Sequence, residues 1–408
     1  MTEPVVESGA ATLGRGTEIS DRLFGRLGPR GGGPTLMCVA GIHGNEPAGI
    51  HALRRVLTAL DAREQEMTGE LVALAGNLSA LNLGQRFVDR DLNRAWTKER
   101  LAALRGNGRV DQAVENREQI ELSEEIETIL GSANARVFAL DLHTTSGAGG
   151  VFSAFTDALP HREFASHFPV PMIFGLEELV DGTLLNLFSD HGLVAIMVET
   201  GQHDEPAAID RAEAAIWIAV VASGLLPERL VPETTAARKL LQRDAGHLPR
   251  ALEMRYKRDL EKGDGFVMTP GYLNFQEIAR GQVVATDNDG DVVVHEDGRL
   301  LMPLYQDQGE DGFFVLREFS PLWMTMSLVM RRLGIARVAH WLPGVRRVEG
   351  TDDEVLVDRH VARFFARQLF HLLGFRQMDD LGTCLIMRRR RFDEGRYLRE
   401  HRSPEPLT

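Results

Sequence analysis

Short apolar runs alternate with amphipathic stretches between residues 35 and 225, and this alternation is what most constrains the fold. Runs typical of buried strands occur at 35–40, 70–75, 136–142, 170–174 and 193–198, and helical patterns lie at 47–60, 115–130 and 207–224. Strands without a polar face must be covered on both sides, so the pattern predicts an α/β fold with helices on both faces of the sheet. In such sheets, ligands bind at the loops that follow the carboxyl ends of the strands.

After residue 225 the pattern of apolar and polar residues changes, which suggests additional structural units. Residues 226–264 are polar and partly helical, and we interpret them as a connector. Residues 265–318 contain short β-type runs between Gly, Asp and Asn turns, which predicts a small β-rich barrel or sandwich. Residues 319–408 are expected to form an α+β C-terminal segment, with helices at 320–333 and 355–375 and a last strand at 383–387.

Polar residues follow three of the apolar runs at the point where each run ends. His43 and Glu46 come after the first run, His143 ends the third, and Glu199 ends the last. Two imidazoles and a carboxylate are a ligand set of catalytic zinc sites, which leave one position open for water. Asp141 shares a strand face with His143, where it can accept the second ring N–H. The pattern predicts a zinc hydrolase in which Glu199 moves protons.

An arginine-rich stretch, residues 86–94, lies between the two histidine motifs. Taken alone, it could form a surface cluster of ion pairs. Beside a zinc site, however, arginine is suited to gripping a substrate carboxylate and to stabilising an oxyanion.

Four motifs in this order resemble those of the succinylglutamate desuccinylase/aspartoacylase family, which is related to the zinc carboxypeptidases. They are His43-Gly44-Asn45-Glu46, Asp91-Leu92-Asn93-Arg94, Asp141-Leu142-His143-Thr144-Thr145 and Val198-Glu199-Thr200-Gly201. The resemblance covers 35–225 strongly and 226–316 more loosely. It implies a carboxypeptidase-like mixed sheet with helices on both faces, and a catalytic domain that spans residues 1–225.

The resemblance also implies a role for each matching residue. His43, Glu46 and His143 would bind one zinc ion per chain, with Glu199 as the catalytic base. Arg86 would polarise the scissile carbonyl, while Asn93 and Arg94 would hold a substrate carboxylate. Members of the family hydrolyse amide bonds of N-acyl amino acids.

Two departures from the family pattern leave the substrate open. Ser189 stands where aspartoacylase has an arginine that selects the acidic acyl group. Residues 313–323 lack the tyrosine that aspartoacylase takes from its C-terminal part, and Tyr272 and Tyr305 are candidate substitutes.

These observations favour a zinc-dependent deacylase that acts on a small acyl-amide substrate. A zinc carboxypeptidase for short peptides and a non-catalytic zinc- or ligand-binding protein are the alternatives. The formal charge of −13 argues against nucleic acid as a partner. No apolar run is long enough to span a membrane, and no secretory signal is evident. Homo-oligomerisation is left open.

Two cysteines and two further histidines also carry expectations. Cys38 and Cys384 are expected to be reduced thiols, which fits a cytoplasmic protein. His51 is expected to be structural, and His203 is a candidate for the wall of the cleft.

Overall fold

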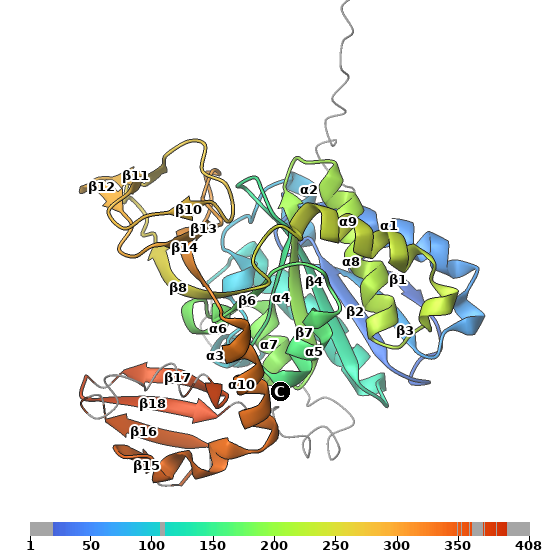
Figure 1. Ribbon diagram of the computed structural model, residues 1–408. Coiled ribbons are helices and arrows are strands. Elements are labelled where there is room, and N and C mark those ends of the chain that lie inside the picture. The colour runs from blue at the N-terminus through green and yellow to red at the C-terminus, as the bar shows by residue number, and fades with distance from the viewer. Residues whose placement is uncertain are drawn as a thin grey trace, which may run out of the picture.

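The computed structural model describes residues 19–106, 111–348, 350–351, 353–358, 360, 370, 372–380 and 382–389. Within these residues, eleven strands form one large mixed sheet in the order β1-β3-β2-β4-β7-β5-β6-β8-β14-β13-β10 (Figure 1). The strands of this large sheet are β1 Leu23–Leu27, β2 Thr35–Ala40, β3 Glu70–Ala75, β4 Val137–Thr145, β5 Phe152–Ala154, β6 Met172–Phe174, β7 Val194–Gln202, β8 Ala251–Asp259, β10 Glu277–Ile278, β13 Gly298–Leu301 and β14 Asp311–Glu318.

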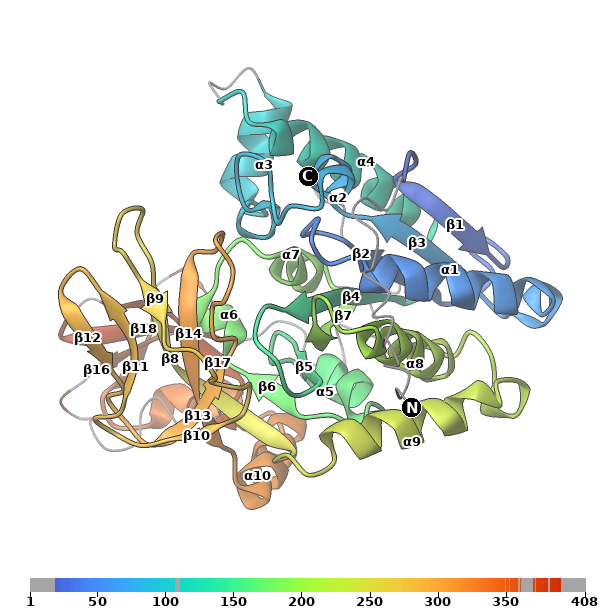
Figure 2. The same ribbon diagram turned by 90° about the horizontal axis from the view of Figure 1, so that it is seen from above.

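Helices cover both faces of the large sheet, as the sequence pattern predicts. They are α1 Ala48–Asp61, α2 Leu78–Leu83, α3 Lys98–Arg105, α4 Val114–Ser132, α5 Leu159–Ser166, α6 Leu176–Leu179, α7 Leu184–Asp190, α8 Ala207–Ala222, α9 Glu233–Ala245 and α10 Pro321–Arg332. Short 3₁₀ helices are η1 Glu64–Glu66, η2 Leu92–Arg94, η3 Glu228–Leu230 and η4 Ile335–Trp341. Seen from above, α1, α8 and α9 lie on one side of the sheet and α3 and α4 on the other (Figure 2).

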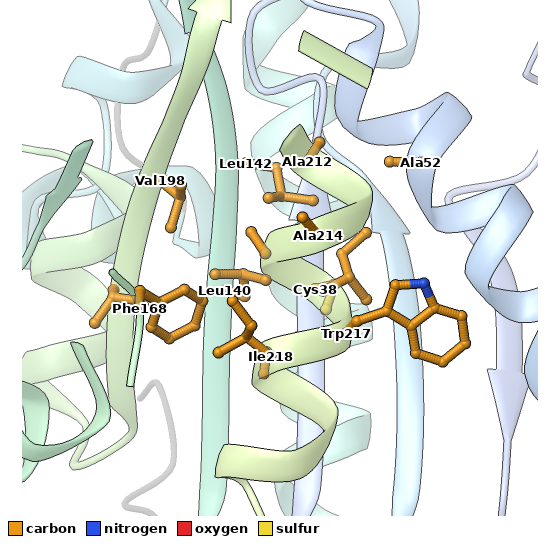
Figure 3. Packing of buried hydrophobic residues seen from close by; sticks show 14 of the residues in the cluster. Cys38, Ala52, Leu140, Leu142, Phe168, Val198, Ala212, Ala214, Trp217 and Ile218 are labelled. Atoms are coloured by element: carbon orange, nitrogen blue, oxygen red, sulfur yellow. The ribbon is translucent and has the colours of Figure 1, made fainter. Parts of the chain in front are cut away.

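The apolar strands are buried on both faces because alternate side chains point to opposite sides. Leu36, Cys38 and Ala40 of β2 belong to the core cluster that also contains apolar residues of α1 and α8. Met37 and Val39 of the same strand belong to the cluster that contains α4. Figure 3 shows the first cluster, in which Trp217 and Ile218 of α8 lie against the strands.

The parallel part of the sheet sets the position of the functional residues. Strand β2 pairs with β3 and with β4, and β4 pairs with β7, all in parallel. The carboxyl ends of β2, β4 and β7 are therefore neighbours at one edge of the sheet.

The range interpreted as a connector contributes to the fold directly. Helix α9 packs on α8, and β8 pairs with β6 on one side and β14 on the other. Strands β10, β13 and β14 extend the large sheet, while β9 Val267–Met268, β11 Val283–Asp287 and β12 Gly290–Val293 form a separate three-stranded sheet. Apolar residues from both sheets share one small core. The barrel or sandwich description and the domain boundaries stay predictions.

The C-terminal segment begins with α10, close to the helix expected at 320–333. Four strands follow as one antiparallel sheet: β15 Val345–Arg347, β16 Glu354–Asp358, β17 Phe375–Asp380 and β18 Cys384–Arg389. The predicted helix at 355–375 is wrong at its start, because residues 354–358 form β16, which pairs with β15 and β18. Residues 361–369 of that prediction lie outside the described residues.

Both cysteines are free in the structure, and Cys38 is fully buried in β2. Burial raises the pKa of the Cys38 thiol, which keeps it protonated and unreactive. Among the described residues, no helix has the length and apolar composition that crossing a membrane requires.

Candidate metal centre and cleft

A cleft of about 100 Å³ opens at the edge of the sheet where β2, β4 and β7 end. Every site residue predicted from the sequence lines this cleft. These residues are His43, Glu46, Arg86, Asn93, Arg94, His143 and Glu199.

The turn after β2 places the first two of them. Gly41 adopts a positive φ of 70°, which glycine reaches without steric cost. At Gly44, a Cβ atom would lie 2.0 Å from the carbonyl carbon of Ala80 in α2, so a side chain does not fit. The chain can therefore turn sharply against α2, and His43 and Glu46 both reach the cleft.

Donor atoms of His43, Glu46 and His143 converge in this cleft, all within 4.8 Å of one another. The Nδ1 atom of His43 lies 2.9 Å from Glu46 Oε1, and the Nδ1 atom of His143 lies 3.1 Å from Glu46 Oε2. Burial alone would raise the pKa of Glu46, but the two histidines hold it well below its usual range. The cluster thus presents an ionised carboxylate and two imidazoles, a donor set that fits a zinc ion.

Each histidine also has a carboxylate near its other ring nitrogen, Nε2. Asp91 Oδ1 lies 3.1 Å from His43 Nε2, and Asp141 Oδ2 lies 3.0 Å from His143 Nε2. Each carboxylate can accept a proton from the Nε2 atom of its ring, so that Nδ1, the ring nitrogen that faces Glu46, is the atom available as a metal donor. The position of Asp141 agrees with the strand alternation, whereas the sequence did not reveal the contact between Asp91 and His43.

Arg86 is fixed by the same Asp91. Its Nε and Nη2 atoms donate to Asp91 Oδ2 over 3.2 and 2.9 Å, and Nη1 lies 3.7 Å from Glu46 Oε1. Burial would raise the pKa of Asp91, but the charges of Arg86 and His43 hold it well below its usual range. Arg86 therefore stays next to the candidate metal-binding cluster, with Nη1 on the side of Glu46.

The predicted carboxylate clamp lies farther along the same wall. Asn93 Oδ1 accepts a hydrogen bond of 2.9 Å from the backbone N–H of Leu184 at the start of α7, which fixes the amide in place. Arg94 donates from Nη1 to the backbone carbonyl of Asn93 and from Nη2 to Asp311 Oδ2 in β14. The sequence did not reveal Asp311 as a partner, because nothing in its surroundings links it to an arginine 217 residues earlier.

Glu199 faces the cluster from the neighbouring strand. It stands opposite His143 in the register of β4 and β7, and it is 4% exposed. Its Oε2 atom has no hydrogen-bond partner among the described residues. Burial raises the pKa of Glu199 well above its usual value, and the charge of Glu46 adds to this effect against the opposing charge of His143. A carboxyl group with a raised pKa is suited to taking up a proton and releasing it again during a reaction.

His203 also lines the cleft, as expected. Its Nδ1 atom lies 2.7 Å from Thr144 Oγ1, and its Nε2 atom lies 3.2 Å from Gln306 Oε1. Burial lowers the pKa of His203, so that the ring is neutral at pH 7. His203 and Gln306 separate the cleft from a second, polar pocket of about 480 Å³.

The two departures from the family pattern have clear positions. Ser189 is buried near the end of α7 and is not part of the cleft wall. Tyr272 and Tyr305 do not line the cleft either, and the Tyr305 hydroxyl donates to the backbone carbonyl of Thr269. Phe314 of β14 is the aromatic residue from the β-rich part that reaches the cleft wall.

The raised pKa of Glu199 makes a prediction for the metal-free protein. A carboxyl group whose pKa is higher in the folded than in the unfolded state keeps its proton longer when folded, so stability falls as pH rises above about 4.5. We expect the melting temperature of Glu199→Gln to exceed that of the wild type at pH 8 by more than at pH 5, with a chelator present.

Glu205→Gln is the matched control for this measurement, because the Glu205 side chain is 37% exposed and does not line the cleft. Its melting temperature should differ from that of the wild type by nearly the same amount at both pH values. A Glu199→Gln advantage that shrinks between pH 5 and pH 8 would contradict the prediction.

The fold and cleft together define a mixed α/β protein with a candidate metal site at the ends of parallel strands. Residues 32–213 match the model of the succinylglutamate desuccinylase/aspartoacylase catalytic domain. This part of the chain is similar to that catalytic domain, which confirms the resemblance inferred from the motifs.

Individual relatives agree with this assignment. The succinylglutamate desuccinylase of Burkholderia lata is 24% identical over 288 residues, which are 66% of this chain and 74% of the relative. The succinylglutamate desuccinylase of Pseudomonas paraeruginosa is 40% identical over 70 residues, which are 17% of this chain and 21% of that protein.

Solved structures share the fold. A succinylglutamate desuccinylase/aspartoacylase from Rhodobacter sphaeroides has a TM-score of 0.52 at 18% identity, over 71% of this chain and 87% of that one. The ectoine utilization protein EutE (DoeB) from Ruegeria pomeroyi has a TM-score of 0.50 at 19% identity, over 71% and 86% of the two chains.

Proposed function

We propose that this protein is a zinc-dependent deacylase that hydrolyses the amide bond of a small N-acyl amino acid. One observation carries the proposal: the donor atoms of His43, Glu46 and His143 converge beside Glu199, a buried carboxyl group with an unpartnered oxygen. Similarity to the catalytic domain of a family named for deacylases supports the same reaction.

His43, Glu46 and His143 would hold the zinc ion. When bound, the ion would supply Lewis acidity, which polarises a carbonyl group and makes water acidic near neutral pH. Asp91 and Asp141, which lie 3.1 and 3.0 Å from the Nε2 atoms of the two rings, would favour Nδ1 as the donor atom of each histidine once the ion is bound.

The other residues of the cleft would carry the proton and the charges. Glu199 would take the proton of the attacking water and deliver it to the leaving nitrogen, which its raised pKa favours. Arg86 Nη1 would stabilise the negative charge that develops on the acyl oxygen. Asn93 and Arg94 would bind the carboxylate of the amino acid.

A substrate screen with zinc-replete protein tests the proposal. We expect release of the free amino acid from N-acyl amino acids and no cleavage of dipeptides with a free amino group, measured by mass spectrometry. Preferential cleavage of dipeptides would instead indicate a carboxypeptidase. Complete lack of turnover over a broad panel of acyl amides would favour a non-catalytic zinc- or ligand-binding protein.

A further inference from the structure

We propose that Asp311 neutralises Arg94 and thereby makes the cleft selective for N-acyl amino acids whose acyl group is uncharged, against succinyl and other acyl groups that carry a carboxylate. This inference rests on the proposed deacylase function and specifies its substrate class.

The positive charges on the cleft wall are already paired with carboxylates of the protein. Among the described residues that line the cleft, the arginines are Arg86 and Arg94. Each already has a carboxylate partner inside the protein: Asp91 binds Arg86, and Asp311 binds Arg94. Glu310 adds another acid to the same wall. The carboxylate of the amino acid can share Arg94 with Asp311, but a second carboxylate on the acyl group would find no cation left to pair with.

Much of the remaining cleft wall is apolar. Six of its side chains offer hydrocarbon or thioether surface, namely Leu176, Val180, Met197, Met302, Leu304 and Phe314. An uncharged acyl group gains from contact with such a surface, whereas a carboxylate loses hydration there without compensation.

Asp311 is also held firmly in place, which makes it a fixed part of the cleft. It is the first residue of β14 and stands opposite Asp259 in the antiparallel pairing with β8. The Lys257 ammonium of β8 lies 3.4 Å from Asp311 Oδ1, while Oδ2 accepts from Arg94. Two cations thus hold one carboxylate with an 11% exposed side chain. A carboxylate on the acyl group would have to compete with Asp311 for Arg94. Asp311 is already fixed in place, so its pairing with Arg94 costs no further conformational entropy.

Two substrates that differ only at the acyl group test this inference. We expect kcat/KM of the zinc-replete protein for N-acetylmethionine to exceed that for N-succinylmethionine by about tenfold or more. In Asp311→Asn, the positive charge of Arg94 is no longer balanced by Asp311, so the ratio of the two kcat/KM values should shift by about tenfold toward the succinyl substrate.

Asp259→Asn is the matched control. Asp259 pairs with the same Lys257 ammonium at 2.6 Å, but its side chain is 72% exposed and does not line the cleft. This variant should keep the wild-type ratio. A wild type that prefers the succinyl substrate, or an Asp311→Asn variant with an unchanged ratio, would overturn the inference and leave the deacylase function intact. If neither substrate nor any other N-acyl amino acid were hydrolysed, the proposed function itself would fail.

Discussion

Glu199→Gln is expected to retain zinc and to lower kcat for N-acyl amino acids by about 10³-fold. The substitution keeps the size of the side chain and leaves His43, Glu46 and His143 untouched. The amide, however, can neither accept the proton of the attacking water nor return it to the leaving nitrogen. Because Glu199 Oε2 has no partner among the described residues, the substitution breaks no known hydrogen bond at that atom. The measurements are zinc content by elemental mass spectrometry and kcat at saturating substrate.

Glu205→Gln serves again as the control, since it makes the same chemical change six residues farther along the chain and outside the cleft. It should have wild-type activity and zinc content. If Glu199→Gln kept full activity, the assignment of proton transfer to Glu199 would be wrong. If it lost zinc together with activity, Glu199 would act on metal binding rather than on the proton.

His43→Ala is expected to lose the metal and, as a consequence, all measurable activity. The variant removes one of three donors, and with it the histidine partner of Asp91 and one of the two histidine partners of Glu46. Loss of a residue that merely orients a ligand typically costs 10- to 100-fold in metal affinity, so loss of a ligand should cost more than about 100-fold. Zinc titration against a competing chelator measures this change directly, without relying on catalysis.

The matched control is His51→Ala, which removes an imidazole from α1 rather than from the cleft. Zinc affinity and activity should both stay near their wild-type values. An equal loss of zinc in the two variants would mean that the effect is one of folding. Undiminished zinc affinity in His43→Ala would show that this histidine is not a ligand.

The fold could be predicted where the sequence pattern has one physical meaning. Strands β2, β3, β4 and β7 are buried on both faces, so that each contains a continuous apolar run. Strand β8 escaped prediction because its second half, from Arg255, is partly exposed and carries charged residues. At β16, the short apolar run from Val355 to Val357 was mistaken for part of a helix, because a run of this length fits either kind of element.

Some residues of the candidate site could be predicted from the sequence and others could not. His43, Glu46, His143 and Glu199 could be found because parallel strands bring their carboxyl ends together, which makes strand position a guide to proximity. Asp311 could not, because its place opposite Arg94 depends on the antiparallel pairing of β14 with β8, which no local pattern reveals. The residue on which substrate selection is proposed to rest is thus one that only the tertiary structure exposes.

The continuity of the large sheet has a consequence for how the protein could change. Strands that carry the metal-binding residues and the strand that carries Asp311 belong to one hydrogen-bonded sheet (Figure 1). The loop between β13 and β14 and the first residue of β14 place Met302, Gln306 and Asp311 along the cleft, and this loop is anchored to the sheet at both ends. Exchange of this loop, together with Asp311, between this protein and a relative should therefore transfer the preference for an acyl group. The residues proposed to carry the reaction would be left unchanged.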